Sequence, residues 1–161
     1  MKKTGEIDSY FETSAHFDKY YRAYGLIRQV SNLLCKYRNK ELSRFKMTTV
    51  KAGVLAAVKT FKSPPTIGEI ARSIYRGQNT VSLLIKRMEK DGLVEKENDQ
   101  KKRTKRRIMI TDKGEEVYQR LIESRGVHNK IVSCLSDAEL DKLIASLRVL
   151  RSKAGEELGM K

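Results

Sequence analysis

The sequence predicts a mainly α-helical fold with one small β-hairpin. Apolar residues at helical spacing recur in the middle and at both ends of the 161 residues. Two short β-prone runs follow the central helices, with a strongly basic stretch between them. We expect one compact domain with three parts: an N-terminal helix (1–45), a central lobe (46–111) and C-terminal helices (112–161).

A long first helix is predicted from Asp8 to about Tyr37. Six of the eleven Tyr and Phe residues lie within its first turns. An aromatic cluster of this density fits either a dimer interface or the wall of a ligand pocket. The assigned candidates are Phe11 and Phe17 for the interface and Tyr20, Tyr21 and Tyr24 for the pocket.

A polar connector is expected at 38–46, followed by a second helix from Thr48 or Thr49 to about Phe61. The apolar spacing turns Val54 and Phe61 toward the core. Two consecutive prolines, at 64 and 65, end this helix because proline lacks an N–H donor and restricts the residue before it.

Two short helices in the middle of the chain are predicted to form a helix-turn-helix. Apolar residues at the i, i+3, i+4, i+7 spacing run from 67 to 74 and again from 81 to 88. Thr66 and Glu69 have the spacing of a capping box at the start of the first helix. Gly77 marks the turn at 75–79, and Gly92 suits a left-handed cap after the second helix.

A β-hairpin is predicted next, in which 93–94 pair with 107–110 around a polar tip at 95–106. Residues 100–107 carry six cations and no acid. Together with the two helices, this hairpin makes a winged helix-turn-helix. Its second helix suits a DNA major groove, and its cationic tip suits phosphates or the minor groove.

The outward face of the second helix carries amide, hydroxyl and cationic groups, which bind base edges and phosphates. The alternative is that the helix pair is only a structural corner and the basic run a solvated loop, and the net charge of +14 argues against it. The residues predicted to contact double-stranded DNA are Thr66 on the first helix, Gln78, Asn79, Thr80, Ser82, Leu83, Lys86 and Arg87 on the second, and Lys101, Lys102, Arg103, Lys105 and Arg106 in the wing.

After the wing, Thr111 is predicted to cap a further helix, which Gly126 bends. Ser136 and Glu139 have capping-box spacing at the start of the last helix. This helix has a leucine-rich stripe that needs cover, either from a second copy in a homodimer or from the first helix of the same chain. The residues assigned to dimerisation on this stripe are Leu140, Leu143, Leu147 and Leu150.

Charge and hydropathy narrow the classes of partner. The 34 Lys and Arg residues against 20 Asp and Glu favour nucleic acid, ahead of an anionic membrane surface. No apolar stretch is long enough to span a bilayer, and residues 1–12 lack the apolar run of a secretory signal. The expected location is therefore the cytoplasm, with no membrane partner.

The chain is not expected to be an enzyme. Its two histidines lie far apart, and it has no nucleophile elbow and no phosphate-binding glycine loop. Cys35 and Cys134 lack metal-ligand spacing, so neither a metal nor another cofactor is expected. We expect both cysteines to be small buried side chains, and an oxidant-sensing thiol is the alternative.

The central segment resembles the winged helix-turn-helix of MarR-type transcriptional regulators. The matching stretches are Glu69-Ile70-Ala71, Asn79-Thr80-Val81-Ser82, residues 87–94 and Thr111-Asp112-Lys113-Gly114. The resemblance implies a two-fold homodimer built from the terminal helices and a palindromic DNA operator. It also implies repression that is relieved by a small ligand, aromatic or amphipathic, or by an oxidant.

One departure from this family concerns the turn, where Tyr75 occupies a position that is often Gly. Because a bulky residue is costly at positive φ, we expect the turn to have a different local shape here. Two other functions fit the same fold, namely ligand-independent architectural DNA binding and a protein-interaction module. The basic wing argues against the second of these.

Overall fold

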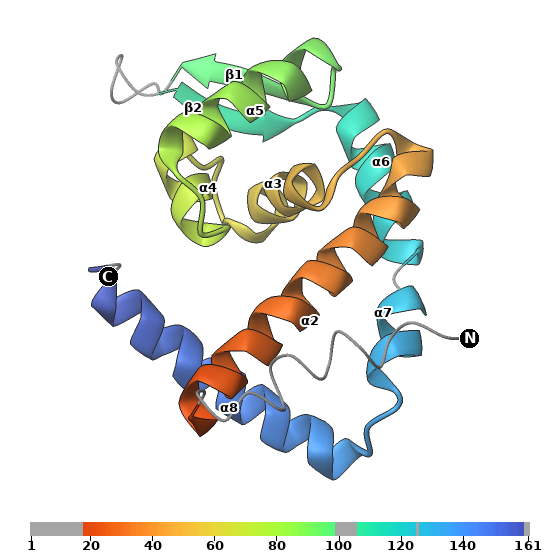
Figure 1. The fold of residues 1–161 in the computed structure, drawn as a ribbon. Helices are drawn as coiled ribbons and strands as arrows, with labels where there is room; N and C mark the ends of the chain where they lie inside the picture. The colour runs from red at the N-terminus through yellow and green to blue at the C-terminus, as the bar shows by residue number, and fades with distance from the viewer. Residues whose placement is uncertain (1–17, 99–105, 125, 160–161) are drawn as a thin grey trace. The chain divides into compact units, whose positions relative to one another are not determined.

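The computed structural model of the chain describes residues 18–98, 106–124 and 126–159. The chain divides into two compact units, residues 1–49 and residues 50–161. The N-terminal unit contains α2 (Lys19–Leu42) and the short 3-10 helix η1 (Ser43–Phe45). The second unit contains most of α3 and all later elements (Figure 1).

Helix α2 begins where Asp18 caps it by accepting hydrogen bonds from the backbone N–H groups of Tyr20 and Tyr21. The predicted end at Tyr37 was wrong, because the helix continues to Leu42 and the expected connector 38–46 is largely helical. The added turn is held by a completely buried Leu42 and by an ion pair between Arg38 and Glu41. The predicted start at Asp8 lies outside the described residues.

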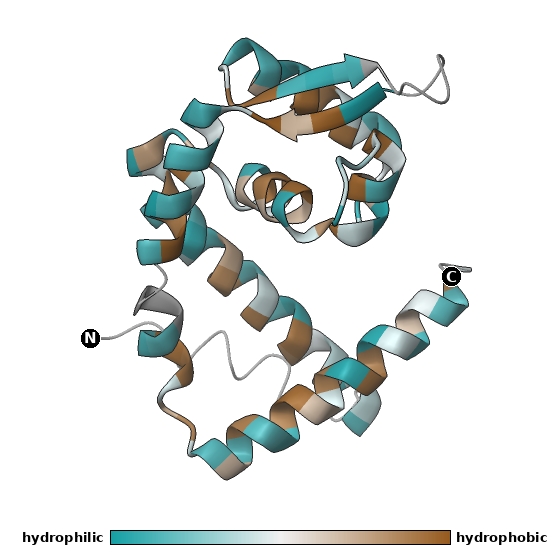
Figure 2. Cartoon of the chain, turned by 180° about the vertical axis from the view of Figure 1, so that it is seen from behind, coloured by the Kyte–Doolittle hydropathy of each residue, from teal (hydrophilic) through white to brown (hydrophobic). Residues whose placement is uncertain are grey.

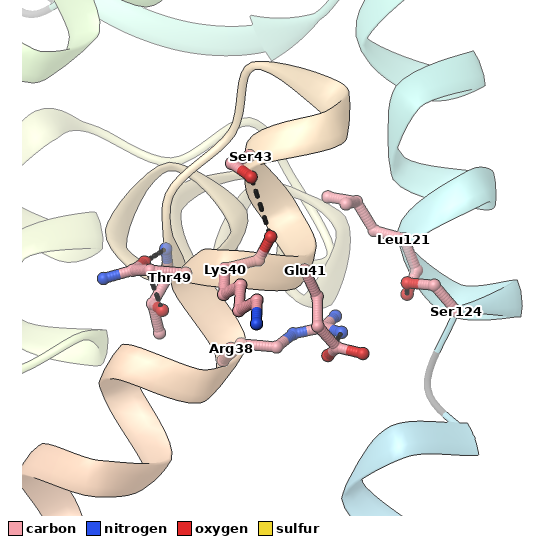
Figure 3. A network of polar contacts seen from close by, with 8 residues as sticks. Arg38, Lys40, Glu41, Ser43, Thr49, Leu121 and Ser124 are labelled. Atoms are coloured by element: carbon pink, nitrogen blue, oxygen red, sulfur yellow. Dashed lines mark hydrogen bonds and ion pairs between the residues drawn. The ribbon is translucent and has the colours of Figure 1, made fainter.

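A small polar network joins the end of α2 to Thr49, the first residue of α3 (Figure 3). The Oδ1 atom of Asn39 accepts hydrogen bonds from both N and Oγ1 of Thr49, each at 2.7 Å. Ser43 Oγ donates to the carbonyl oxygen of Lys40 at 2.7 Å, and Lys46 then takes a left-handed conformation (φ 54°). These bonds satisfy backbone groups where α2 gives way to α3.

The central lobe consists of α3 (Thr49–Thr60), α4 (Ile67–Ser73), α5 (Gln78–Lys90) and the hairpin β1 (Val94–Asn98) and β2 (Arg106–Ile110) (Figure 1). Its core is built from fully buried side chains of all these elements, namely Val54, Leu55, Ile70, Val81, Ile85, Met88, Val94 and Ile108. The inward position predicted for Val54 is confirmed. Phe61 instead lies beyond the end of α3 with 37% of its surface exposed, so its predicted inward position was wrong.

The predicted capping box at the start of α4 is confirmed. The hydroxyl of Thr66 accepts from the N–H of Glu69, and the Glu69 carboxylate accepts from the N–H of Thr66. Gly92 has the expected left-handed conformation after α5, with φ of 72°. The turn shape was predicted wrongly, because Tyr75 adopts a φ of 54° despite its side chain. This side chain is 57% exposed, so it is not packed into the core of the lobe.

The wing is an antiparallel pair in which Val94 lies opposite Ile110 and Asn98 opposite Arg106. Strand β1 therefore extends beyond the predicted 93–94 into the polar stretch. Its side chains alternate, because Val94 is buried while Glu95 is exposed, and Lys96 forms an ion pair with Glu89 of α5. The prediction relied on a run of apolar residues. The observed strand instead has side chains that alternate between buried and exposed positions, together with an ion pair to α5.

The C-terminal helices are α6 (Asp112–Glu123), α7 (Gly126–Val132) and α8 (Asp137–Glu157). Thr111 caps α6 as predicted, by accepting from the N–H of Gly114. The expected bend at Gly126 was wrong, because α6 ends at Glu123 and a separate helix follows. The C-cap of α6 is Ser124, whose hydroxyl donates to Leu121 O (Figure 3). The Ser136 cap of α8 is confirmed, since Glu139 accepts from both its N–H and its hydroxyl.

Candidate nucleic-acid interface

Helix α5 presents two chemically different faces. Val81, Ile85 and Met88 are completely buried and fix the helix on the lobe. The side chains predicted to contact DNA occupy the opposite face. Of these, the exposed ones are Gln78, Asn79, Thr80, Leu83, Lys86 and Arg87, and Ser82 is half-buried.

The C-terminal end of α5 is held by two lysines from other helices. Lys51 of α3 forms an ion pair with the Asp91 carboxylate at 2.8 Å, and Lys113 of α6 donates to the Asp91 carbonyl at 2.8 Å. The hydrogen bond from Lys51 lowers the pKa of Asp91 below its usual range. These contacts favour the charged carboxylate and restrain the end of the helix.

Three consecutive carbonyl oxygens after α5 accept hydrogen bonds from residues that open α6. Asp91 O accepts from Lys113 Nζ, Gly92 O accepts from Thr111 Oγ1 at 2.7 Å, and Leu93 O accepts from Thr111 N at 3.3 Å. The end of one helix is thereby fastened to the beginning of another. Sequence reasoning missed this junction, although the Thr111 cap pointed to one half of it.

The wing is fastened to α4 through Arg107 of β2. Its Nη1 atom donates to the carbonyl oxygen of Pro64 at 3.0 Å and lies 3.7 Å from the Glu69 carboxylate. Ile108 N donates to Pro65 O at 2.9 Å, and Thr66 forms an isolated bridge with Arg107. The segment before α4 therefore pairs with the outer side of β2.

Glu69 is the centre of this arrangement. One of its carboxylate oxygens accepts from the N–H of Thr66 at 2.7 Å and from its hydroxyl at 2.8 Å. The backbone hydrogen bond from Thr66 is the main reason why the pKa of Glu69 lies below its usual range, with the nearby Arg107 charge acting in the same direction.

The two described arginines of the basic run, Arg106 and Arg107, therefore have different surroundings. Arg107 turns toward the protein, whereas Arg106 is exposed. The predicted contacts Lys101, Lys102, Arg103 and Lys105 lie outside the described residues, so their assignment stays a prediction. Thr66, also predicted to contact DNA, is half-buried and its hydroxyl is engaged with Glu69.

A polar cleft of about 520 Å³ lies between the start of α5 and strand β2. We call it the Gly68 cleft, and its lining residues are Thr66, Ile67, Gly68, Glu69, Arg72, Gln78, Arg106 and Arg107. Sequence reasoning missed Gly68 and Arg72 as members of this surface. Their spacing of four residues places them on one face of α4, which was the available signal.

A second cleft, of about 550 Å³ and mainly apolar, lies between α3 and α4. Gly53, Ala56, Ala57, Phe61 and Ile74 are among its lining residues. The small side chains of α3 leave this space open. None of the tyrosines assigned to a ligand pocket lines either of these two clefts.

Those tyrosines and the leucine stripe of α8 are instead exposed in the single chain. Tyr20, Tyr21 and Tyr24 all lie on the surface of α2. No residue of α8 is buried, and Leu143, Leu147 and Leu150 are exposed while Leu140 is half-buried. Figure 2 shows hydrophobic residues recurring along both α2 and α8. Phe11 and Phe17 lie outside the described residues.

The expectation of two buried cysteines was wrong. Cys35 is half-buried, and Cys134 is exposed. Asn39 donates a weak hydrogen bond to Cys35 Sγ at 3.7 Å. Within the described ranges, no group of His, Cys, Asp and Glu side chains could hold a metal ion, and no described helix is long and apolar enough to cross a membrane.

Comparison with known proteins identifies the lobe. The family model for a winged helix DNA-binding domain matches residues 47–114. HTH-type transcriptional regulators of Bacillus cereus and Bacillus anthracis are 28% identical over 120 residues, which cover 74% of this chain and 79% of each relative.

Solved structures share the fold. The organohalide-sensing transcriptional regulator RdhR bound to 2,4-dichlorophenol has a TM-score of 0.79 at 23% identity, covering 95% of this chain and 86% of its own. Staphylococcus aureus MepR in complex with DNA has a TM-score of 0.74 at 23% identity, covering 88% and 99%. AbsC, a MarR family transcriptional regulator from Streptomyces coelicolor, has a TM-score of 0.78 at 19% identity, covering 88% and 98%. With the polar face of α5 and the wing beside it, these findings lead to one conclusion: residues 47–114 form a winged-helix DNA-binding domain, in a chain that is similar to HTH-type transcriptional regulators and shares the fold of a MarR family structure.

Proposed function

We propose that the protein acts in the cytoplasm as a homodimeric repressor that reads a palindromic operator with two copies of α5. The observation that carries this proposal is the contrast between the two faces of α5. Its apolar face is buried, and its outer face offers amide, hydroxyl and cationic groups to a partner. Such groups bind base edges in a major groove, while Arg106 and the neighbouring wing are suited to phosphates.

Dimerisation is proposed because α8 buries none of its side chains within one chain. A helix with a leucine stripe and no buried residue is unstable in isolation, since helices in proteins derive most of their stability from packing. A two-fold dimer would cover the stripe and would place two α5 helices about 34 Å apart, as a palindrome requires.

A small aromatic or amphipathic effector is proposed to change the affinity for DNA. Support comes from the mainly apolar cleft between α3 and α4 and from the exposed tyrosines of α2. The structurally similar RdhR is bound to 2,4-dichlorophenol. An effector shifts DNA binding only if it has different affinities for the DNA-competent and DNA-incompetent states.

The experiment is selection of operator sequences from random duplexes, followed by binding titrations with operator and scrambled DNA. Thr80→Ala should reduce the ratio of operator to scrambled affinity, because a base contact is worth about 1–3 kcal/mol of discrimination. Lys142→Ala, an exposed change on α8, is the control. Equal loss on both duplexes would mean that α5 does not read bases.

Two further measurements test the rest of the proposal. Light scattering during gel filtration should give twice the mass of one chain. Titration of chlorinated phenols and oxidants into the operator complex should release DNA. A ligand-independent architectural binder would keep the same affinity throughout and would show no preference for a palindrome.

A further inference from the structure

We propose that the Gly68 cleft holds one sugar–phosphate strand of the bound DNA, with Arg72 and Arg106 as the phosphate ligands. This inference rests on the proposed function, in which α5 enters a major groove. It assigns a specific task to Arg72 and Gly68, which lie outside the predicted DNA-contacting set.

The Gly68 cleft lies where a DNA strand would pass between α5 and the wing. Gln78 at the start of α5 lines one side, Arg106 of β2 lines the other, and Gly68 and Arg72 of α4 lie between them. In a duplex, the major and minor grooves are separated by one sugar–phosphate strand. If α5 occupies the major groove and the wing reaches the adjacent minor groove, that strand has to cross the cleft.

The charged side chains that line the cleft give it a surplus of positive charge, which suits a phosphate. Three guanidinium groups and one carboxylate line it. The carboxylate, Glu69, accepts two hydrogen bonds from Thr66 and lies 3.7 Å from Arg107, so it is occupied within the protein. Arg72 and Arg106 are both exposed and leave the cleft with a surplus of positive charge. Guanidinium groups bind phosphate oxygens with two parallel hydrogen bonds.

Gly68 has no side chain, which allows a ligand to approach the backbone of α4 closely. A Cβ atom built at this position would lie 3.6 Å from Gln78 Oε1 and 3.7 Å from Arg72 Nη1. These are ordinary contact distances, so the fold itself does not require glycine here. A glycine in a helix destabilises it relative to alanine, and it is useful where a ligand approaches the backbone closely. A DNA strand that approaches the first turn of α4 beside the Gln78 and Arg72 side chains is such a ligand.

The first test is Gly68→Ala, which separates folding from binding. Because alanine is the better helix former and meets only ordinary contacts, the melting temperature should rise. The affinity for operator and for scrambled duplex should fall about tenfold, since the added methyl group keeps the strand away. Higher stability with unchanged DNA affinity would overturn the proposal.

The second test is Arg72→Gln, measured as the salt dependence of binding. Loss of one phosphate contact should lower the slope of log K against log salt concentration by about 0.9, on both operator and scrambled DNA. The matched control is Arg120→Gln on α6, an exposed arginine outside the cleft, whose slope should equal that of the wild type. Equal slopes for Arg72→Gln and the wild type would contradict the assignment.

A third measurement locates the phosphate on the DNA. Operator duplexes carrying one neutral methylphosphonate at each position in turn should include one that weakens the wild type but not Arg72→Gln. If the wild type binds operator and both cleft variants bind equally well, this inference fails while the proposed function stands. If the wild type binds no duplex, the proposed function fails with it.

Discussion

The Cβ atom that Gly114 lacks would lie 2.0 Å from the carbonyl oxygen of Leu93. It would also lie 2.8 Å from Cγ1 of Ile110. The first turn of α6 therefore packs directly against the backbone that follows α5. No side chain other than hydrogen fits at this position without a shift of the main chain.

Gly114→Ala is therefore expected to destabilise the protein by about 3 kcal/mol or more, because backbone, and not a flexible side-chain end, has to move. Urea denaturation followed by circular dichroism measures this change. Gly53→Ala is the matched control. Gly53 lies within α3, and a Cβ atom at this position would meet only Cγ2 of Ile74, at 3.7 Å. That variant should be as stable as the wild type or more stable, by about 0.5–1 kcal/mol. Equal stability of the two variants would contradict the close approach at Gly114.

The second prediction concerns the stability of Tyr75 variants, because Tyr75 has a φ of 54°. Left-handed backbone costs a residue with a bulky side chain about 1–2 kcal/mol, whereas asparagine tolerates it. Tyr75→Asn should therefore raise the free energy of unfolding by about 0.5–1 kcal/mol. Tyr75→Phe keeps the backbone preference and should leave the stability near that of the wild type. A loss of stability in Tyr75→Asn would mean that contacts of the exposed ring outweigh the backbone term.

The leucine stripe of α8 makes a third prediction, on the oligomeric state. Leu147→Asp places a charge on the stripe, where burial against a second copy would cost several kcal/mol. The variant should elute as a monomer, or dissociate at much lower dilution, in gel filtration with light scattering. Leu158→Asp, an equally radical change just after α8, is the control. A dimer that survives Leu147→Asp unchanged would place the interface elsewhere.

Glu69 makes a fourth prediction, on the pH dependence of stability. Hydrogen bonds from Thr66 hold the pKa of Glu69 below its usual range in the folded protein. Its contribution to stability is therefore fully present above the unfolded-state pKa and is lost as the pH falls through the lower, folded-state pKa. The difference in stability between the wild type and Glu69→Gln should be largest at pH 7 and should shrink between about pH 5 and pH 3.

Denaturant titrations of both proteins across that pH range measure the difference. Glu95→Gln, at an exposed position of β1, controls for the loss of one surface carboxylate. A difference between wild type and Glu69→Gln that stays constant with pH would show that the charge of Glu69 does not stabilise the α4 cap.

Local rules were enough to predict the framework of the fold. The caps at Thr66, Thr111 and Ser136 could be located because each needs only a few residues at fixed spacing. The buried face of α5 followed from its apolar period, and Gly92 from its freedom at positive φ.

The errors arose where partners distant in sequence decide the outcome. Strand β1 extends through polar residues because β2 supplies its hydrogen bonds. Arg107 reads as one more cation of the wing, yet its carbonyl partner Pro64 lies 43 residues away. The turn at Tyr75 shows the same limit, since the surrounding helices impose a backbone conformation that its residue type disfavours.

The three carbonyl contacts between residues 91–93 and residues 111–113 have a mechanical consequence. Because consecutive backbone carbonyl groups accept these bonds, we expect α5 and the first turn of α6 to move together. A rotation of α6 should therefore be passed to α5, whose outer face we propose contacts the bases. A rotation of α6 that is too small to disturb the core is then expected to move the outer face of α5 relative to the operator that we propose.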